Sequence, residues 1–219
     1  MQNLFYVLNW ILLILLIVLI SFLIWWGIIL RIIRRYHPFP IPAFMTQVID
    51  NPIRRRFIQK PHLIAERMNL KPGMIVVEVG PGKGSYTKAV AEKILPDGKV
   101  YATDIQQGVL DRLKKRIDKE KLTNIIPQIE NAHEFTFKDE SIDRVFMISC
   151  LPEIPNPIKV LKECKRILKP DGLVSLSELA PDPDYPRRKT EKRWAKEAGL
   201  VFKEQFGNWF TYQLNFGKE

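Results

Sequence analysis

Residues that build disulfide scaffolds and metal centres are scarce in this chain of 219 residues. It contains two cysteines, Cys150 and Cys164, and three histidines. Two cysteines are too few for a disulfide framework, and no cluster of His, Cys and Asp has the spacing of metal ligands. The sequence therefore predicts no metal site. Its hydrophobic content of 46% and its charged content of 26% are typical of a folded domain rather than a disordered chain.

Charged side chains are absent from residues 1–30. Between Ile11 and Leu30 only Ser21 and Gly27 interrupt a run of Ile, Leu, Val, Phe and Trp. At about 1.5 Å per residue in a helix, roughly 20 such residues cross the roughly 30 Å hydrocarbon core of a bilayer. Aromatic residues stand near both ends of the run, as interfacial belts do: Tyr6, Trp10, Trp25 and Trp26. We therefore expect a transmembrane helix over residues 1–30, with residues 4–30 as the anchor.

A cleaved signal peptide and a buried core helix are the competing interpretations of this run. A signal peptide has a basic start, a shorter apolar core and a small-residue cleavage site, and all three are missing here. A core helix is not apolar on every side over such a length. Arginines follow the run at Arg31, Arg34 and Arg35, whereas only the amino terminus precedes it. The positive-inside rule therefore predicts a single-pass protein with its N-terminus outside and its larger part cytoplasmic.

Residues 31–58 are expected to form a basic juxtamembrane linker. Prolines prevent one continuous helix here: Pro38, Pro40, Pro42 and Pro52. Apolar residues between them and the cluster Arg54–Arg56 favour a segment that lies on an anionic membrane surface. The alternative is a linker whose apolar residues pack on the domain and whose arginines are solvated. A membrane-facing surface also explains the net charge of +10, and no nucleic-acid motif is visible.

The stretch from Met74 to Thr87 organises the remaining chain. A short apolar run, 74–79, is typical of a strand buried on both faces of a parallel sheet. Glycines then let the backbone approach a ligand, and helical spacing resumes at Thr87. Strand, glycine loop and helix together indicate a nucleotide-type site. Ser85 breaks the dinucleotide fingerprint G-x-G-x-x-G, and the spacing of a P-loop is also absent.

The pattern Glu78-x-Gly80-x-Gly82-x-Gly84 closely resembles the first motif of the class I S-adenosylmethionine-dependent methyltransferases, especially the quinone-biosynthesis C-methyltransferases. The resemblance covers residues 59–219 in order. It implies an α/β fold, a Rossmann-like, seven-stranded and mostly parallel sheet with a C-terminal antiparallel hairpin. It also implies S-adenosylmethionine as the cofactor.

The pattern of apolar residues and turns predicts the elements of this domain by range. Strands are expected at 74–79, 99–103, 124–129, 143–149, 173–179, 200–205 and 209–216. Helices are expected at 62–70, 87–95, 107–119, 157–168 and 191–198. The turn at 168–172, Leu-Lys-Pro-Asp-Gly, resembles a widespread turn of the family before its fifth strand.

The resemblance assigns the cofactor to residues at the ends of the first four strands. Asp104 follows the second strand and is expected to hold the cofactor ribose; a carboxylate can accept two hydrogen bonds from a diol. A helix cap is its alternative role, and both roles are compatible. Asn131 stands where the family usually has an acid beside the adenine, unless Glu130 takes that role. The full predicted set is Glu78, Gly80, Gly82, Gly84, Asp104, Ile105, Asn131, Ala132 and Ser149.

The turn from Ser149 to Pro155 is expected beside the reacting methyl group, because ligands gather at the carboxyl ends of parallel strands. A general base is needed only if the acceptor must lose a proton. Candidates on the expected acceptor side are His133, Glu153, Glu178, Asp182, Asp184 and Tyr185. Each can equally be a solvated loop residue or a cap, and we take Glu153, Tyr185 and His133 as the catalytic candidates.

These features together predict a membrane-anchored methyltransferase that acts on a lipophilic acceptor, either a phospholipid head group or a quinone precursor. The partners expected are membrane lipids, contacted by residues 4–30 and by the basic clusters 54–56 and 187–196. Two alternatives stay open. One is a tethered methyltransferase of a soluble small molecule, and the other is a cofactor-binding membrane scaffold without catalysis.

Overall fold

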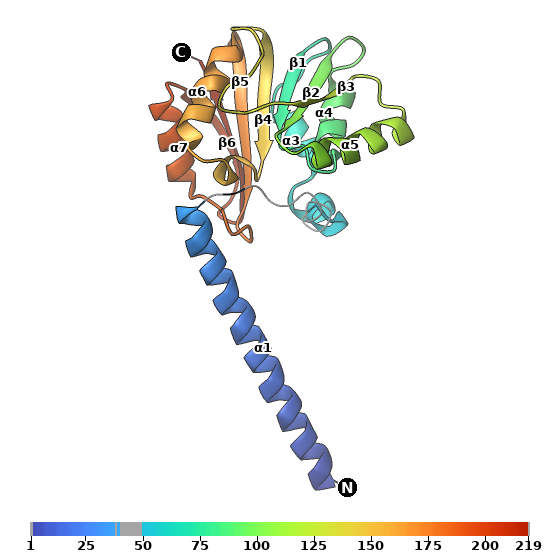
Figure 1. Ribbon diagram of the computed structural model, residues 1–219, viewed down its shortest axis with the longest axis vertical. Coiled ribbons are helices and arrows are strands. Elements are labelled where there is room, and N and C mark those ends of the chain that lie inside the picture. The colour runs from blue at the N-terminus through green and yellow to red at the C-terminus, as the bar shows by residue number, and fades with distance from the viewer. Residues whose placement is uncertain (1, 38, 40–49, 219) are drawn as a thin grey trace.

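The computed structural model describes residues 2–37, 39 and 50–218 (Figure 1). An α/β domain stands at one end of a long helix, α1 (Gln2–Tyr36), and the N-terminus of α1 points away from that domain. Much of the predicted interfacial linker lies outside the described residues. This holds for Pro38, Pro40, Ile41, Pro42, Phe44, Met45, Val48 and Ile49.

Helix α1 contains a stretch, Phe5–Arg34, that is long and apolar enough to cross a membrane. The mean hydropathy of its most apolar part is 3.1, and none of that part is buried in the domain. The helix ends at Tyr36 rather than near Leu30. Its last turns therefore carry Arg31 and Arg34 to the surface of the domain.

One seven-stranded sheet forms the centre of the domain. Its order is β3-β2-β1-β4-β5-β7-β6. The first five strands run parallel, and β7 is antiparallel to both β5 and β6. The predicted fold class is confirmed. The strands are β1 (Ile75–Val79), β2 (Lys99–Asp104), β3 (Ile125–Ile129), β4 (Ile142–Ile148), β5 (Leu168–Leu179), β6 (Val201–Gly207) and β7 (Thr211–Gly217).

Helices cover both faces of the sheet (Figure 1). On one side lie α3 (Pro61–Glu66), α4 (Ser85–Lys93) and α5 (Gln107–Glu120). On the other lie α6 (Pro157–Ile167) and α7 (Arg188–Glu197). Two short helical turns complete the domain, the π-helical η1 (Arg54–Ile58) and the 3₁₀-helical η2 (Leu151–Glu153).

The two-sided cover explains the nearly continuous apolar run of β1. Successive side chains of a strand point to opposite faces. Val76 accordingly packs in the core beneath α4 and α5, whereas Val77 packs in the core beneath α6 and α7. Both are fully buried. A strand buried on both faces is therefore apolar at nearly every position, and in β1 only Glu78 departs from this pattern.

The predicted elements differ from the structure mainly at their ends. The helix expected at 62–70 ends at Glu66, before the turn that leads into β1. Strand β5 begins at Leu168 rather than at Leu173. Leu168 pairs with Ile142, and pairing then resumes between Leu173 and Arg144. The expected turn therefore exists as a bulge inside the strand.

Candidate active site

A cavity of about 200 Å³ lies at the carboxyl ends of β1, β2 and β4. Parallel α/β sheets bind ligands at this edge. Nine of the residues predicted as cofactor-binding or catalytic line the cavity: Gly80, Gly82, Asp104, Ile105, Asn131, Ala132, His133, Ser149 and Glu153. Glu78, Gly84 and Tyr185 do not line it. The structure thus brings together most, but not all, of the predicted site.

The glycine loop between β1 and α4 forms one wall of the cavity. Gly80, Gly82 and Gly84 have φ angles of 72°, 52° and 77°, in the left-handed region that favours glycine. A Cβ atom on Gly80 would lie 2.5 Å from the Sγ atom of Cys150. The backbone of the loop can therefore come this close to its neighbours, and to a ligand, only because side chains are absent.

Glu78 lies beneath the glycine loop and not in the cavity wall. Its side chain is fully buried, and the hydroxyl of Thr87 donates a hydrogen bond to its carboxylate. Burial raises the pKa of Glu78 to about 8. The residue therefore joins the end of β1 to the first turn of α4 and fixes the loop between them.

Asp104 is the last residue of β2 and lines the cavity. Its Oδ1 atom accepts a hydrogen bond of 2.8 Å from the backbone N–H of Gln106, which directs the chain into α5. Burial raises the pKa of this carboxyl above its ordinary value. Asp104 thus stabilises its own turn and still borders the cavity. It is not the cap of α5, because the N-cap residue of that helix is Gln106.

The turn after β3 brings Asn131 and Ala132 to the cavity. The Oδ1 atom of Asn131 accepts a hydrogen bond of 3.0 Å from the backbone N–H of His133. The turn therefore already uses the amide oxygen. Glu130 also lines the cavity, but its carboxylate accepts hydrogen bonds from the backbone N–H of Thr136, at 3.0 Å, and from Gln128. Glu130 thereby stabilises the turn itself.

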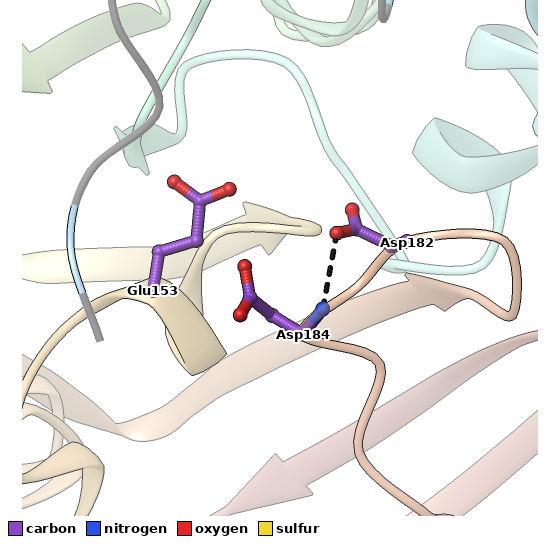
Figure 2. Close-up of side chains that lie close together, drawn as sticks. All are labelled: Glu153, Asp182 and Asp184. Carbon is purple, nitrogen blue, oxygen red and sulfur yellow. Dashed lines mark hydrogen bonds between the residues drawn. The ribbon is translucent and has the colours of Figure 1, made fainter. Parts of the chain in front are cut away.

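Three carboxylates meet on the other side of the cavity (Figure 2). Glu153 ends η2, and it faces Asp182 and Asp184 on the loop after β5. The backbone N–H of Asp184 donates to Asp182 at 3.4 Å. We call these three residues the acidic cluster. One carboxylate oxygen of each lies within 4.8 Å of the others, and Glu153 and Asp182 line the cavity.

The positive charge beside the acidic cluster comes from α1. The guanidinium of Arg34 donates a hydrogen bond to Asp184 and lies 3.8 Å from a carboxylate oxygen of Glu153. Burial raises the pKa of Asp184, and the positive charge of Arg34 opposes this effect in part, so that the pKa is about 6. Within residues 2–37, 39 and 50–218, the acidic cluster is the one group of acids and histidines compact enough to share a cation. In the structure Arg34 is that cation.

The segment from Asp50 to Gln59 covers the cavity on a further side. Arg54 is buried, and it donates hydrogen bonds of 2.6 Å to Gln59 and 2.9 Å to the hydroxyl of Ser149. Asp50 accepts a hydrogen bond of 2.6 Å from Ser85, at the start of α4. The prediction that Arg54 lies at a membrane surface is wrong. Its side chain points into the domain because Gln59 and Ser149 supply acceptors there.

All three catalytic candidates have partners in the structure, and that of Glu153 is Arg34. His133 contacts the carbonyl oxygen of Pro155 through Nε2, so it connects the turns after β3 and β4. Tyr185 donates to the carbonyl oxygen of Trp209, and its ring lies 5.6 Å from that of Tyr212. Glu153 is therefore the catalytic candidate whose carboxylate belongs to both the cavity wall and the acidic cluster.

Several cavity residues have no signal in the sequence. Arg54 and Asp50 precede the first predicted element of the domain, and no spacing relates them to the glycine loop. Only the tertiary structure reveals these two residues. Cys150, by contrast, belongs to the turn expected beside the reacting methyl group, and it lines the cavity. Burial raises the pKa of its thiol well above the ordinary value, and the neutral thiol fills space against Gly80.

The cavity has the chemistry of a site for an adenine nucleoside. The backbone at Gly80 and Gly82 leaves room that a Cβ atom would fill, and Asp104 offers a carboxylate at the end of the neighbouring strand. Ile105 and Val109 supply apolar surface beside it. The hydroxyl groups of a ribose need polar partners, and the face of the attached base needs apolar surface, so a nucleoside requires both.

The chain resembles known methyltransferases across its central part. Residues 77–176 match a family model described as a methyltransferase domain. The chain is 32% identical over 119 residues to the demethylmenaquinone methyltransferase of Geobacillus stearothermophilus, which covers 54% of this chain and 51% of that protein. Residues 77–176 thus form a methyltransferase domain, on the fold of the class I S-adenosylmethionine-dependent enzymes.

Two further proteins agree with this methyltransferase assignment. The ubiquinone/menaquinone biosynthesis C-methyltransferase UbiE of Hydrogenovibrio crunogenus is 31% identical over 142 residues, which is 62% of this chain and 53% of that protein. An S-adenosylmethionine-dependent methyltransferase from Aquifex aeolicus shares the fold, with a TM-score of 0.75 and 22% identity over 81% of this chain and 98% of that one. The chain spans about half the length of the curated relatives it matches.

The predicted family, fold and cofactor are confirmed. S-adenosylmethionine, when bound, supplies an electrophilic methyl group on a sulfonium. The residues that would hold it are the backbone of Gly80 and Gly82 and the side chains of Asp104 and Ile105. The roles of single residues stay predictions, which the experiments below address.

Proposed function

We propose that this methyltransferase is anchored in a membrane by α1 and methylates a quinone precursor that resides in the same membrane. The observation that carries the proposal is the contact between the end of α1 and the cavity wall. Arg31 donates a hydrogen bond of 2.6 Å to the carbonyl oxygen of Ala180, and Arg34 binds Asp184. The loop after β5 thus joins the end of an apolar helix to the cavity.

The printed names of the curated relatives support a quinone acceptor. Both the Geobacillus and the Hydrogenovibrio proteins are named for methylation in menaquinone or ubiquinone biosynthesis. Such acceptors carry a polar ring and are concentrated in lipid. An anchored enzyme reaches them without extraction into water, and holding two reactants in place lowers the entropic cost of the reaction.

The proposed reaction forms one carbon–carbon bond. An electron pair of the acceptor ring forms this bond as the bond between the methyl group and sulfur breaks, and sulfur retains the electron pair of the broken bond. The methylated ring carbon then loses its proton to a base. Glu153 and Asp182 are the carboxylates of the acidic cluster that line the cavity, so they are placed to accept this proton.

A phospholipid amine head group is the second acceptor class, and the acidic cluster is the observation that favours it. Three carboxylates near one another suit an ammonium group. Arg34 already supplies a cation to Asp184 and Glu153, however. A second cation would have to displace it, so we favour the uncharged ring of a quinone precursor.

The side of the domain from which α1 leaves would face the bilayer. Exposed apolar residues lie on η1, directly before it, and on the turn between β6 and β7, at that end of the domain (Figure 1). They are Ile53, Phe57 and Trp209. We include the basic residues Arg187, Arg188 and Arg193 in this surface, since each charge near an anionic leaflet contributes about 1 kcal/mol of attraction. The N-terminus of α1 would lie outside and the domain in the cytoplasm.

The acceptor can be identified by reconstitution. Full-length protein is placed in vesicles of phosphatidylethanolamine and phosphatidylglycerol, with or without a demethylmenaquinone, and S-adenosylmethionine carrying an isotopically labelled methyl group is added. Mass spectrometry of the extracted lipids should show the label on the quinone ring only. Label on the amine head group would favour the second acceptor class. Label on no lipid, with cofactor binding intact, would overturn the proposal.

A further inference from the structure

The C-terminal end of α1 reaches the acceptor side of the cavity through two arginines. Among the described residues, Arg31 donates hydrogen bonds to backbone, the carbonyl oxygens of Ala180 at 2.6 Å and Asp182 at 3.5 Å. Arg34 instead binds carboxylates, those of Asp184 and Glu153. The two residues therefore differ in what they hold: one holds the path of the loop, and the other holds the acidic cluster.

The contacts of Arg34 are almost dry. Its side chain is 6% exposed, and those of Asp184 and Glu153 are 5% and 11% exposed. Its second guanidinium nitrogen donates to the carbonyl oxygen of Phe39 at 3.1 Å, and the ring of Phe39 lies 4.6 Å from the guanidinium carbon. A planar guanidinium with several partners has one orientation. Carboxylates that bind it are fixed in the same way.

The acidic cluster depends on this charge. Carboxylate oxygens of Glu153, Asp182 and Asp184 lie within 4.8 Å of one another. Like charges this close repel strongly in a dry environment unless a cation balances them. Without Arg34, the carboxylates would separate or take up protons. Because Glu153 and Asp182 belong to the cavity wall, either response would change that wall.

We propose that Arg34 is a positioning residue of the acceptor site: it holds Glu153 and Asp184 in place, so that the site has its functional shape only while α1 is bound to the domain. The inference rests on the proposed methyl transfer and adds that the membrane helix contributes a residue to the site. The cofactor half of the cavity, at Gly80 and Asp104, contains none of these contacts.

Kinetics of the full-length protein in vesicles separate positioning from other roles. The variant R34Q should raise the KM for the acceptor about tenfold, whereas its Kd for S-adenosylmethionine should change less than twofold. R34K keeps the positive charge but lacks the planar guanidinium group, so its KM for the acceptor should lie between those of wild type and R34Q. R34Q with D184N removes both partners and should lower the KM again relative to R34Q alone. The matched control K115Q removes an exposed positive charge from α5, outside the proposed membrane-facing surface, and should behave as wild type.

A second measurement needs no methyl transfer and therefore stands if the proposed acceptor is wrong. Cys150 lines the cavity beside η2, and Cys164 is buried in the core as an internal reference. A maleimide should modify Cys150 several-fold faster in R34Q than in wild type or K115Q, with Cys164 unchanged. Equal labelling rates in R34Q and wild type would overturn the inference, as would an equal loss of cofactor and acceptor affinity. If Cys150 is labelled faster in R34Q but the wild-type protein transfers no methyl group, only the proposed function is overturned.

Discussion

The guanidinium of Arg54 donates a hydrogen bond of 2.9 Å to the hydroxyl of Ser149, although 95 positions separate the two residues. The bond joins the segment before α3 to the residue that follows β4. Ser149 has a positive φ of 49°, so its backbone is held in an uncommon conformation. A residue from outside the sheet thus fixes the strand end at the centre of the cavity.

We predict that Arg54→Gln destabilises the protein by about 1.5–3 kcal/mol, the usual range for hydrogen bonds of charged groups. The substitution removes donors from Ser149 and Gln59 in a buried place. Urea unfolding followed by circular dichroism measures the loss. The neighbouring R56Q is the matched control, because Arg56 is exposed. Equal stability of the two variants would show that Arg54 is not a structural part of the cavity.

Asp104→Ala should weaken the binding of S-adenosylmethionine by about 1.5–3 kcal/mol, because a carboxylate that accepts hydrogen bonds from the ribose is lost. Asp104 lines the cavity at the end of β2. Isothermal titration calorimetry gives the difference directly. D97N changes an exposed acid in the turn before β2 and serves as the control. Unchanged affinity in D104A would remove Asp104 from the cofactor site.

Gly80→Ala should lower both the thermal stability and the cofactor affinity. A left-handed conformation costs an L-residue about 1–2 kcal/mol, and the new methyl group would lie 2.5 Å from the sulfur of Cys150. The double variant G80A/C150A relieves the contact but not the conformation. The melting temperature of the double variant should therefore fall by less than the sum of the decreases measured for G80A and C150A. A decrease equal to that sum would contradict the close packing seen here.

The stability of the protein should fall as the pH rises through about 8, partly because of Glu78. The folded protein raises the pKa of Glu78 to about 8 from an ordinary 4.5, through burial. The folded state therefore binds more protons than the unfolded chain between these values, and the contribution of Glu78, complete below pH 4.5, is lost above pH 8.

Glu78→Gln tests this pH dependence. Melting temperatures of E78Q and wild type should be similar at pH 5, and E78Q should be the more stable protein at pH 9. E92Q is the control, since the side chain of Glu92 is 59% exposed. A difference between E78Q and wild type that is the same at both pH values would show that Glu78 does not change its protonation over this range.

Local patterns were sufficient to predict most of the domain. The β-branched run of β1, the glycines after it and the acid that ends β2 are each specified by neighbours in sequence, and all are found in their expected elements. The same holds for α5, the helix expected at 107–119, which buries Val109, Leu110, Leu113 and Ile117 at helical spacing. Periodicity determines these features because each faces a sheet built from the same pattern.

The acceptor side could not be predicted in this way. Arg34 contacts Asp184 and Arg54 contacts Ser149, in each case across a long stretch of chain. A charge pattern alone does not tell a buried arginine from a solvated one. The catalytic role of Tyr185 stays a prediction, and its contacts could not be predicted either. Its position in a loop after β5 favoured a catalytic role, whereas its hydroxyl is bonded to Trp209 outside the cavity wall. Side-chain direction in irregular loops depends on packing that no local pattern records.

The central claim is that the anchored domain methylates an acceptor held in the membrane. The most direct test compares methyl transfer by full-length protein in vesicles to a demethylmenaquinone with a long isoprenoid tail and to the same ring without its tail, at equal total concentration. The initial rate should be at least about tenfold higher for the membrane-embedded acceptor. Equal rates for the two acceptors, or transfer to the water-soluble ring alone, would contradict the account.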